Sequence, residues 1–236
     1  MASIKDSVEE AFQDNNSLLK FILFAIPLFI IVNYSQENIP GYNLWVILTS
    51  LLLFGFMLYC TYNVRAGESQ VLPSFNIFSI LLTGLKGIIA LAPMAIVSIF
   101  LSKFIVNILT TYIPDESVVK VFSYIVYGIC GSFVYTSYLL YATKFKIMDA
   151  YNIKSIFAYC VDVLVAILFM VIQVILVDAI MIAPVTYIIW LFFGIPHPVA
   201  IFFWSIIFIY TLAIVGHYLA QISYEIIEVK ETKKND

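Results

Sequence analysis

An acidic side chain lies inside a long apolar stretch of this sequence, where few charged groups could pair with it. Residues 163–193 contain no Lys or Arg, and Asp178 lies among them with Gln173 five residues earlier. A carboxylate at membrane depth is costly unless it is paired or hydrated, so such an acid indicates a binding or ion-handling site. The alternative is that Asp178 meets water where Pro184 interrupts the helix.

Tyrosines recur on one face of another apolar stretch, residues 118–141. At about 100° per residue, four of them fall within a narrow arc on the same side as Lys120, namely Tyr124, Tyr127, Tyr135 and Tyr138. A stripe of hydroxyl groups could form a polar groove through a bilayer. Alternatively, the hydroxyls form hydrogen bonds between helices that approach closely at Gly128, Gly131 and Ser132.

Two further polar side chains could bind a ligand. Arg65 is the only arginine, and its planar fork could hold a carboxylate or a phosphate, including that of a lipid headgroup; alternatively it pairs with Glu68. His217 shares a helical face with Tyr210 and Gln221. We interpret it as a buried imidazole with satisfied hydrogen bonds rather than as a ligand or a proton relay.

Signatures of catalysis are missing from the sequence. It has no H-E-x-x-H, no G-x-S-x-G, no pair of intramembrane aspartates at helical spacing and no phosphate-binding loop. His197 and His217 alone cannot form a metal site, and Cys60, Cys130 and Cys160 show no C-x-x-C spacing. The sequence also has no basic patch for nucleic acid. We therefore expect no enzymatic activity, no metal ion, no cofactor and no nucleic-acid partner.

The elements that position these side chains must lie in lipid. Of the 236 residues, 63% are hydrophobic and 11% are charged, whereas soluble domains average about 45–50% and about 25%. The mean hydropathy is +1.01. The apolar stretches are continuous rather than alternating, so the composition predicts an all-α, polytopic transmembrane bundle and not a β-barrel.

Six stretches approach the length of about 20 residues that a helix needs to cross a bilayer. They are residues 18–32, 44–62, 82–109, 118–141, 163–193 and 199–219. The fifth is too long for a single crossing, and we expect Pro184 to divide it. Residues 182–193 could then span the membrane, re-enter it or lie at its surface.

Charged segments flank this transmembrane domain, which comprises residues 18–222. Within residues 1–17, four apolar residues recur at helical spacing among acids, namely Ile4, Val8, Ala11 and Phe12. That pattern predicts an amphipathic helix at the membrane surface, and residues 223–236 form a charged cytoplasmic tail. Of the 12 basic residues, ten fall on the side of the two termini. Because cytoplasmic loops are rich in Lys and Arg, we predict about six spans with both termini in the cytoplasm.

Two segments of the transmembrane domain resemble each other, at about 44–109 and 118–193. Residues 75–80 (FNIFSI) match residues 151–156 (YNIKSI) at an offset of 76. Each copy is predicted to consist of a span, a basic turn, an interfacial helix and a second span. Two parallel internal repeats related by an axis along the membrane normal would follow. Lys86 and Asp162 occupy equivalent positions and could form an inter-repeat ion pair; alternatively, each snorkels to the interface.

Three short segments resemble a known family signature: residues 62–68 (YNVRAGE), 72–75 (LPSF) and 83–86 (TGLK). They are similar to an uncharacterised bacterial and archaeal membrane family, the domain-of-unknown-function family numbered four thousand and thirteen. The resemblance covers most of the chain and is strongest over residues 5–95. It implies a multi-span protein of the bacterial or archaeal cytoplasmic membrane, and it implies no activity.

These observations predict a non-enzymatic, membrane-embedded protein that binds or transports a lipid or another small amphiphile. The prediction rests on Asp178, on the tyrosine stripe and on the turns that face lipid headgroups. Membrane lipids are the expected partners. The alternative is a structural or accessory subunit that binds another membrane protein or a second copy of itself.

Overall fold

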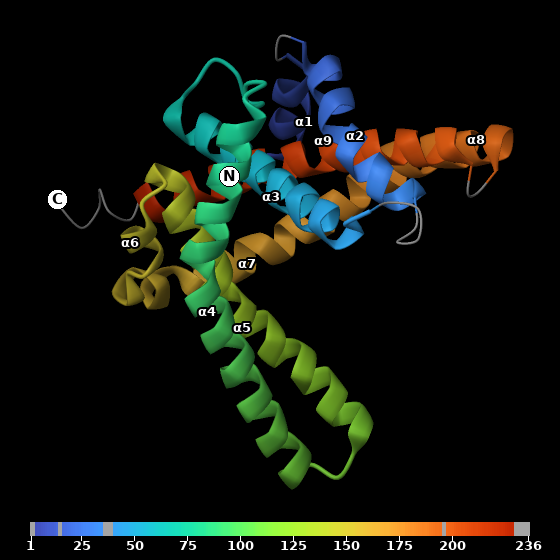
Figure 1. Ribbon diagram of the computed structural model, residues 1–236. Helices are drawn as coiled ribbons and strands as arrows, with labels where there is room; N and C mark the ends of the chain where they lie inside the picture. Colours follow the sequence, from blue (N-terminus) through green and yellow to red (C-terminus); the bar gives the residue numbers. More distant parts are fainter. Residues whose placement is uncertain (1–2, 14–15, 35–39, 195–196, 229–236) are drawn as a thin grey trace. The chain divides into compact units, whose positions relative to one another are not determined.

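All regular secondary structure in the described part of the chain is helical. The computed structural model describes residues 3–13, 16–34, 40–194 and 197–228 (Figure 1). In chain order the helices are α1 (Ile4–Gln13), α2 (Ser17–Asn33), α3 (Tyr42–Ala66), α4 (Ile77–Tyr112), α5 (Glu116–Lys144), α6 (Ile147–Ala150), α7 (Ile153–Val177), η1 (Asp178–Ile182), α8 (Ala183–Phe193), α9 (Pro198–Ser223) and η2 (Tyr224–Glu228). The predicted all-α fold class is confirmed.

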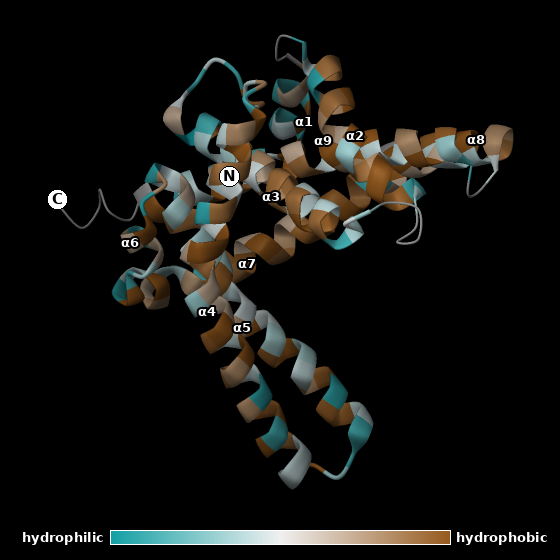
Figure 2. Cartoon of the chain, in the orientation of Figure 1, coloured by the Kyte–Doolittle hydropathy of each residue, from teal (hydrophilic) through white to brown (hydrophobic). Residues whose placement is uncertain are grey.

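Five of the described helical segments are long and apolar enough to cross a membrane. They are Tyr42–Ala66, Ile77–Tyr112, Glu116–Lys144, Ile153–Ile180 and Pro198–Ile227, and a sixth crossing results if α1 and α2 together form one bent span. Hydrophobic residues predominate along these helices, as Figure 2 shows, and many of their large apolar side chains are exposed. Phe100 of α4 and Val161 of α7, for example, are 70% and 67% exposed. Because water would solvate so much apolar surface poorly, the chain is an integral membrane protein.

The chain forms two compact units. The first comprises residues 1–85 and 169–221, and the second comprises residues 86–168 and 222–236. The core of the first unit joins α1, α2, α3, the start of α4 and α9, with fully or nearly fully buried side chains from each: Ala11, Phe21, Phe24, Leu52, Phe56, Ile80, Ile209 and Ala213. Three aromatic rings add edge and tilted contacts, with Tyr210 4.8 Å from Phe12 and 5.6 Å from Phe21 between ring centroids.

Within this first unit, α3 and the start of α4 cross at two glycines. A Cβ atom on Gly55 would overlap the carbonyl oxygen of Ile80, and a Cβ atom on Gly84 would overlap that of Leu51. The two backbones approach so closely only because neither crossing residue carries a side chain. Small residues allow the same close approach between helices in lipid, where packing rather than hydrophobicity drives association.

The second unit contains the rest of α4, α5, α6 and the start of α7. Asp115 caps α5, since its carboxylate accepts a hydrogen bond from the Ser117 backbone N–H at 2.8 Å. The close helix approach predicted at Gly128 and Gly131 is not observed. Among the described residues, a Cβ atom on Gly131 would meet nothing within 4 Å, and one on Gly128 would meet only a leucine side chain at 4.0 Å.

A hydroxyl group links α4 to α5 instead. The Ser98 Oγ donates to the carbonyl oxygen of Cys130 at 2.6 Å, and both residues are buried. The contact therefore uses a serine of α4 that the tyrosine pattern of α5 did not indicate.

The two similar segments begin their second helix in the same way. Asn76 Oδ1 accepts from the Ser79 N–H and Asn152 Oδ1 accepts from the Ser155 N–H, each at 3.1 Å. The matching of residues 75–80 with 151–156 thus reflects two equally capped helix starts. Superposition of the whole repeats stays a prediction.

The separate interfacial helices expected within the repeats are not observed. α4 begins at Ile77 and continues without interruption to Tyr112, and α7 begins at Ile153 and continues to Val177. α7 contains neither glycine nor proline, and α4 continues through Gly84, Gly87 and Pro93, none of which ends the helix. Each expected pair of elements is therefore one helix.

Candidate functional site

The helix that carries Asp178 changes type before Pro184. Pro184 has no backbone N–H, and its ring crowds the carbonyl group four residues earlier. The structure accommodates this with the wider turn η1, in which the Ala183 N–H donates to the carbonyl oxygen of Asp178, five residues back. Pro184 therefore widens the helix where the sequence suggested a division. Such π-helical turns frequently occur at functional sites, because they reposition the side chains around them.

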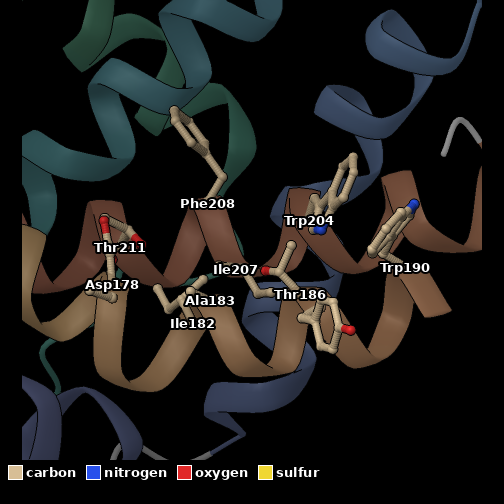
Figure 3. Close-up of a pocket in the computed structure, with 11 residues that line it drawn as sticks. Asp178, Ile182, Ala183, Thr186, Trp190, Trp204, Ile207, Phe208 and Thr211 are labelled. Atoms are coloured by element: carbon tan, nitrogen blue, oxygen red, sulfur yellow. The ribbon is translucent and has the colours of Figure 1, made fainter. Parts of the chain in front are cut away.

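A groove of about 930 Å³ lies between η1–α8 on one side and α9 on the other (Figure 3). η1 and α8 form one wall with Asp178, Ala179, Ile182, Ala183, Thr186, Tyr187 and Trp190. α9 forms the other wall with Trp204, Ile207, Phe208 and Thr211. All of these residues belong to the first unit. The volume lies in the range of small-molecule sites, about 300–1,000 Å³.

The two ends of the groove differ in chemistry. Asp178 and Thr211 lie together at one end, whereas Trp190 lies at the other end, with Trp204 nearest to it (Figure 3). Between them, Ile182 and Ile207 provide aliphatic surface, and Thr186 adds a hydroxyl group. An elongated molecule with a polar head and an apolar body would match this arrangement.

Asp178 is the only charged side chain in the groove walls. It is half-buried, and no hydrogen bond or ion pair to its carboxylate is seen among the described residues. Neighbouring sequence supplies no basic partner either, because no Lys or Arg occurs between Lys154 and Lys230. An acid without a counter-charge in an apolar groove is the electrostatic feature that distinguishes this site.

His217 lies in a different cluster of the first unit, which fastens α1 to α9. Its Nε2 is 2.7 Å from Glu10 Oε2, and its Nδ1 is 2.9 Å from Ser7 Oγ and 3.1 Å from Gln221 Nε2. The Ser3 backbone N–H donates to Gln221 Oε1, so the Gln221 amide N–H₂ points to the imidazole. Nδ1 is then an acceptor and Nε2–H donates to Glu10.

Ser7, His217 and Glu10 are the residue types of a hydrolytic triad, but their arrangement serves packing. Ser7 and His217 are 0% and 1% exposed, so a substrate carbonyl could not reach the serine hydroxyl. The Ser7 hydroxyl also lies 3.1 Å from the carbonyl oxygen of Ser3, within its own helix. His217 is thus a buried imidazole with polar partners on both ring nitrogens.

The other residues singled out from sequence do not line the groove. Gln173 is half-buried on α7. On α5, Tyr124, Tyr127 and Tyr135 are exposed and Tyr138 is buried. Their role in binding stays a prediction.

The charged residues singled out from sequence also lie elsewhere. Arg65 is half-buried in the last turn of α3, Lys86 is exposed on α4 and Asp162 is half-buried on α7. Headgroup binding by Arg65 and the ion pair between Lys86 and Asp162 stay predictions. Within the described ranges, no cluster of His, Cys, Asp and Glu could hold a metal ion.

The sequence analysis missed the α9 wall of the groove. Trp204, Ile207, Phe208 and Thr211 follow the i, i+3, i+4, i+7 spacing of a single helical face. The i, i+3, i+4, i+7 spacing can be read from the sequence. Because α9 is apolar on all of its faces, however, the spacing does not indicate which face contacts another helix.

No family model, no curated protein and no solved structure matches the chain. Membership of the family that residues 62–86 resemble therefore stays a prediction.

Proposed function

We propose that this membrane protein binds a lipid or another small amphiphile in the groove between η1–α8 and α9. The observation that carries the proposal is the polarity gradient of the groove, from Asp178 and Thr211 at one end to Trp190 and Trp204 at the other. Binding sites of small molecules combine apolar and aromatic walls with a few placed polar groups in the same way.

The depth of the groove in the membrane supports binding from the lipid phase. Thr211 lies near the middle of the apolar helix Pro198–Ile227, and Asp178 lies beside Thr211 (Figure 3). Asp178 is also two residues from the end of the apolar segment Ile153–Ile180, so the polar end of the groove would lie within the apolar layer of the bilayer. The tryptophans would lie closer to the surface, where aromatic rings are enriched.

The alternative function, an accessory subunit that binds another membrane protein, predicts a bundle without such a groove.

The proposal includes no catalytic role. Among the described residues of the groove walls, Asp178 and Tyr187 are the only titratable groups, and most reactions require several converging groups. The excess of basic residues on the predicted side of the two termini supports a cytoplasmic membrane location with both termini inside.

Photo-cross-linking tests the proposal directly. The full chain in nanodiscs of the uncharged lipid digalactosyl diacylglycerol is irradiated with an uncharged monoacylglycerol that carries a diazirine in its tail. We expect adducts on residues 178–211, mapped by mass spectrometry of the peptides. Ala183→Trp places a large ring in the groove and should reduce these adducts severalfold.

Ile188→Trp is the matched control, because Ile188 is exposed on α8 and does not line the groove. This variant should keep the adducts on residues 178–211. Uniform labelling of all lipid-facing helices, unaffected by Ala183→Trp, would contradict the proposal.

A further inference from the structure

We infer that the amphiphile carries a positively charged amino or quaternary ammonium group that pairs with Asp178; this inference rests on the proposed function. The shared chemistry is a cation attached to an apolar body. It could belong to a single-chain lipophilic amine or to a two-chain lipid with an amino headgroup.

Charge complementarity is the first argument. The groove contains a carboxyl group and neither Lys, Arg nor His in its walls. A carboxylate held within the apolar layer of a bilayer is costly until a cation neutralises it, and an uncharged ligand leaves that cost in place. A cationic ligand removes it, whereas an anionic ligand would add repulsion. The groove therefore discriminates among ligands by the sign of their charge.

The aromatic walls provide the second, independent argument. Tyr187, Trp190, Trp204 and Phe208 all border the groove. The faces of aromatic rings carry negative potential and attract ammonium groups, with tryptophan the most effective. The tryptophans lie at the other end of the groove from Asp178, so their faces draw a cation into the groove while the carboxylate pairs with it at the polar end. Thr211, beside Asp178, and Thr186 contribute acceptor oxygens.

Competition against the uncharged photo-probe tests the inference. Competitors with the same dodecyl tail carry a trimethylammonium, a hydroxyl or a sulfonate headgroup, and a two-chain trimethylammonium lipid is the fourth. For the unmodified protein we expect the single-chain or the two-chain cation to displace the probe at about tenfold lower concentration than the uncharged compound. Whichever cation displaces more strongly identifies the source of the ligand. The sulfonate should be the weakest.

Two substitutions locate the effect. Asp178→Asn keeps the shape of the side chain and should abolish the advantage of the cations over the hydroxyl compound. Thr211→Lys brings a cation beside Asp178 and should have the same effect with the acid intact, which keeps the test valid should one variant fail to fold. Asp162→Asn is the control, because Asp162 lies on α7 outside the groove walls and should leave the preference intact.

The outcomes separate the inference from the proposed function. If the uncharged probe does not label residues 178–211, the proposed function fails. If the probe labels them but the ratio of cationic to uncharged displacement is the same in the unmodified protein and in Asp178→Asn, the inference fails and the proposed function remains.

Discussion

His217 shows how strongly a single buried polar side chain can depend on its partners. Its two ring nitrogens contact Glu10 on one side and Ser7 and Gln221 on the other. We predict that His217→Leu lowers the free energy of unfolding by about 1–3 kcal/mol, because the Gln221 amide N–H₂ and the Glu10 carboxylate lose this partner and the Ser7 hydroxyl keeps only the Ser3 carbonyl oxygen. Thermal unfolding in detergent measures the loss.

His197→Leu is the control, since His197 is exposed; its Nδ1 accepts from the Val199 backbone N–H at 3.2 Å, and its ring centroid lies 5.6 Å from that of Phe193. Its melting temperature should stay close to that of the unmodified protein. Equal melting temperatures for both histidine variants would show that the cluster does not stabilise the fold.

At the residue scale, the sequence indicated which polar side chains are unusual but did not indicate which residues they contact. Asp178 could be singled out because an acid in an apolar stretch is costly whatever surrounds it. The partners of His217 could not be found in this way, because Ser7 and Glu10 precede it by more than 200 residues. Only the folded chain brings them to α9, and single-sequence patterns are local.

At the level of the elements, the crossing of α3 with α4 depends on Gly55 and Gly84. We predict that Gly84→Ala lowers the free energy of unfolding by about 1–3 kcal/mol, because its Cβ would overlap the Leu51 carbonyl oxygen and force the helices apart. Gly55→Ala should have a similar effect through Ile80. Thermal unfolding in detergent again provides the measurement.

Gly131→Ala is the matched control for the glycine series. Gly131 also lies inside a long helix, but its Cβ would meet no described atom within 4 Å. Since alanine favours helix more than glycine does, this variant should be neutral or slightly more stable. A loss as large as that of Gly84→Ala would show that the helix crossing is not the cause.

Elements were predictable where local chemistry specifies them. The apolar stretches located α2 to α5, α7 and α9, and the amphipathic spacing located α1. The sequence did not predict that the amphipathic start and the apolar part of α4 form one continuous helix. Hydrophobic periodicity indicates which face of a helix is buried, but it does not indicate whether two helical segments are continuous. The widening at η1 was also missed, since Pro184 allows either a break or a wider turn and packing decides between them.

At the scale of the whole molecule, the question is whether α2 crosses the membrane. α2 has 17 residues with Pro27 inside, which is short for a span. The basic residues Lys5 and Lys20 near the N-terminus nevertheless favour a cytoplasmic start. With α2 as a crossing, the chain has six spans and both termini share a side.

Cysteine labelling of intact cells with a membrane-impermeant maleimide tests this topology. Asn43, in the first turn of α3, and Ser117, in the first turn of α5, are exposed and should react from outside as Asn43→Cys and Ser117→Cys, whereas Lys5→Cys should react only after the cells are opened. The three native cysteines are buried and should contribute little background. Because an α-helical crossing places its two ends on opposite sides, labelling of positions 5 and 43 from the same side would mean that α2 does not cross. Labelling of position 117 only from the cytoplasm would reverse the predicted orientation.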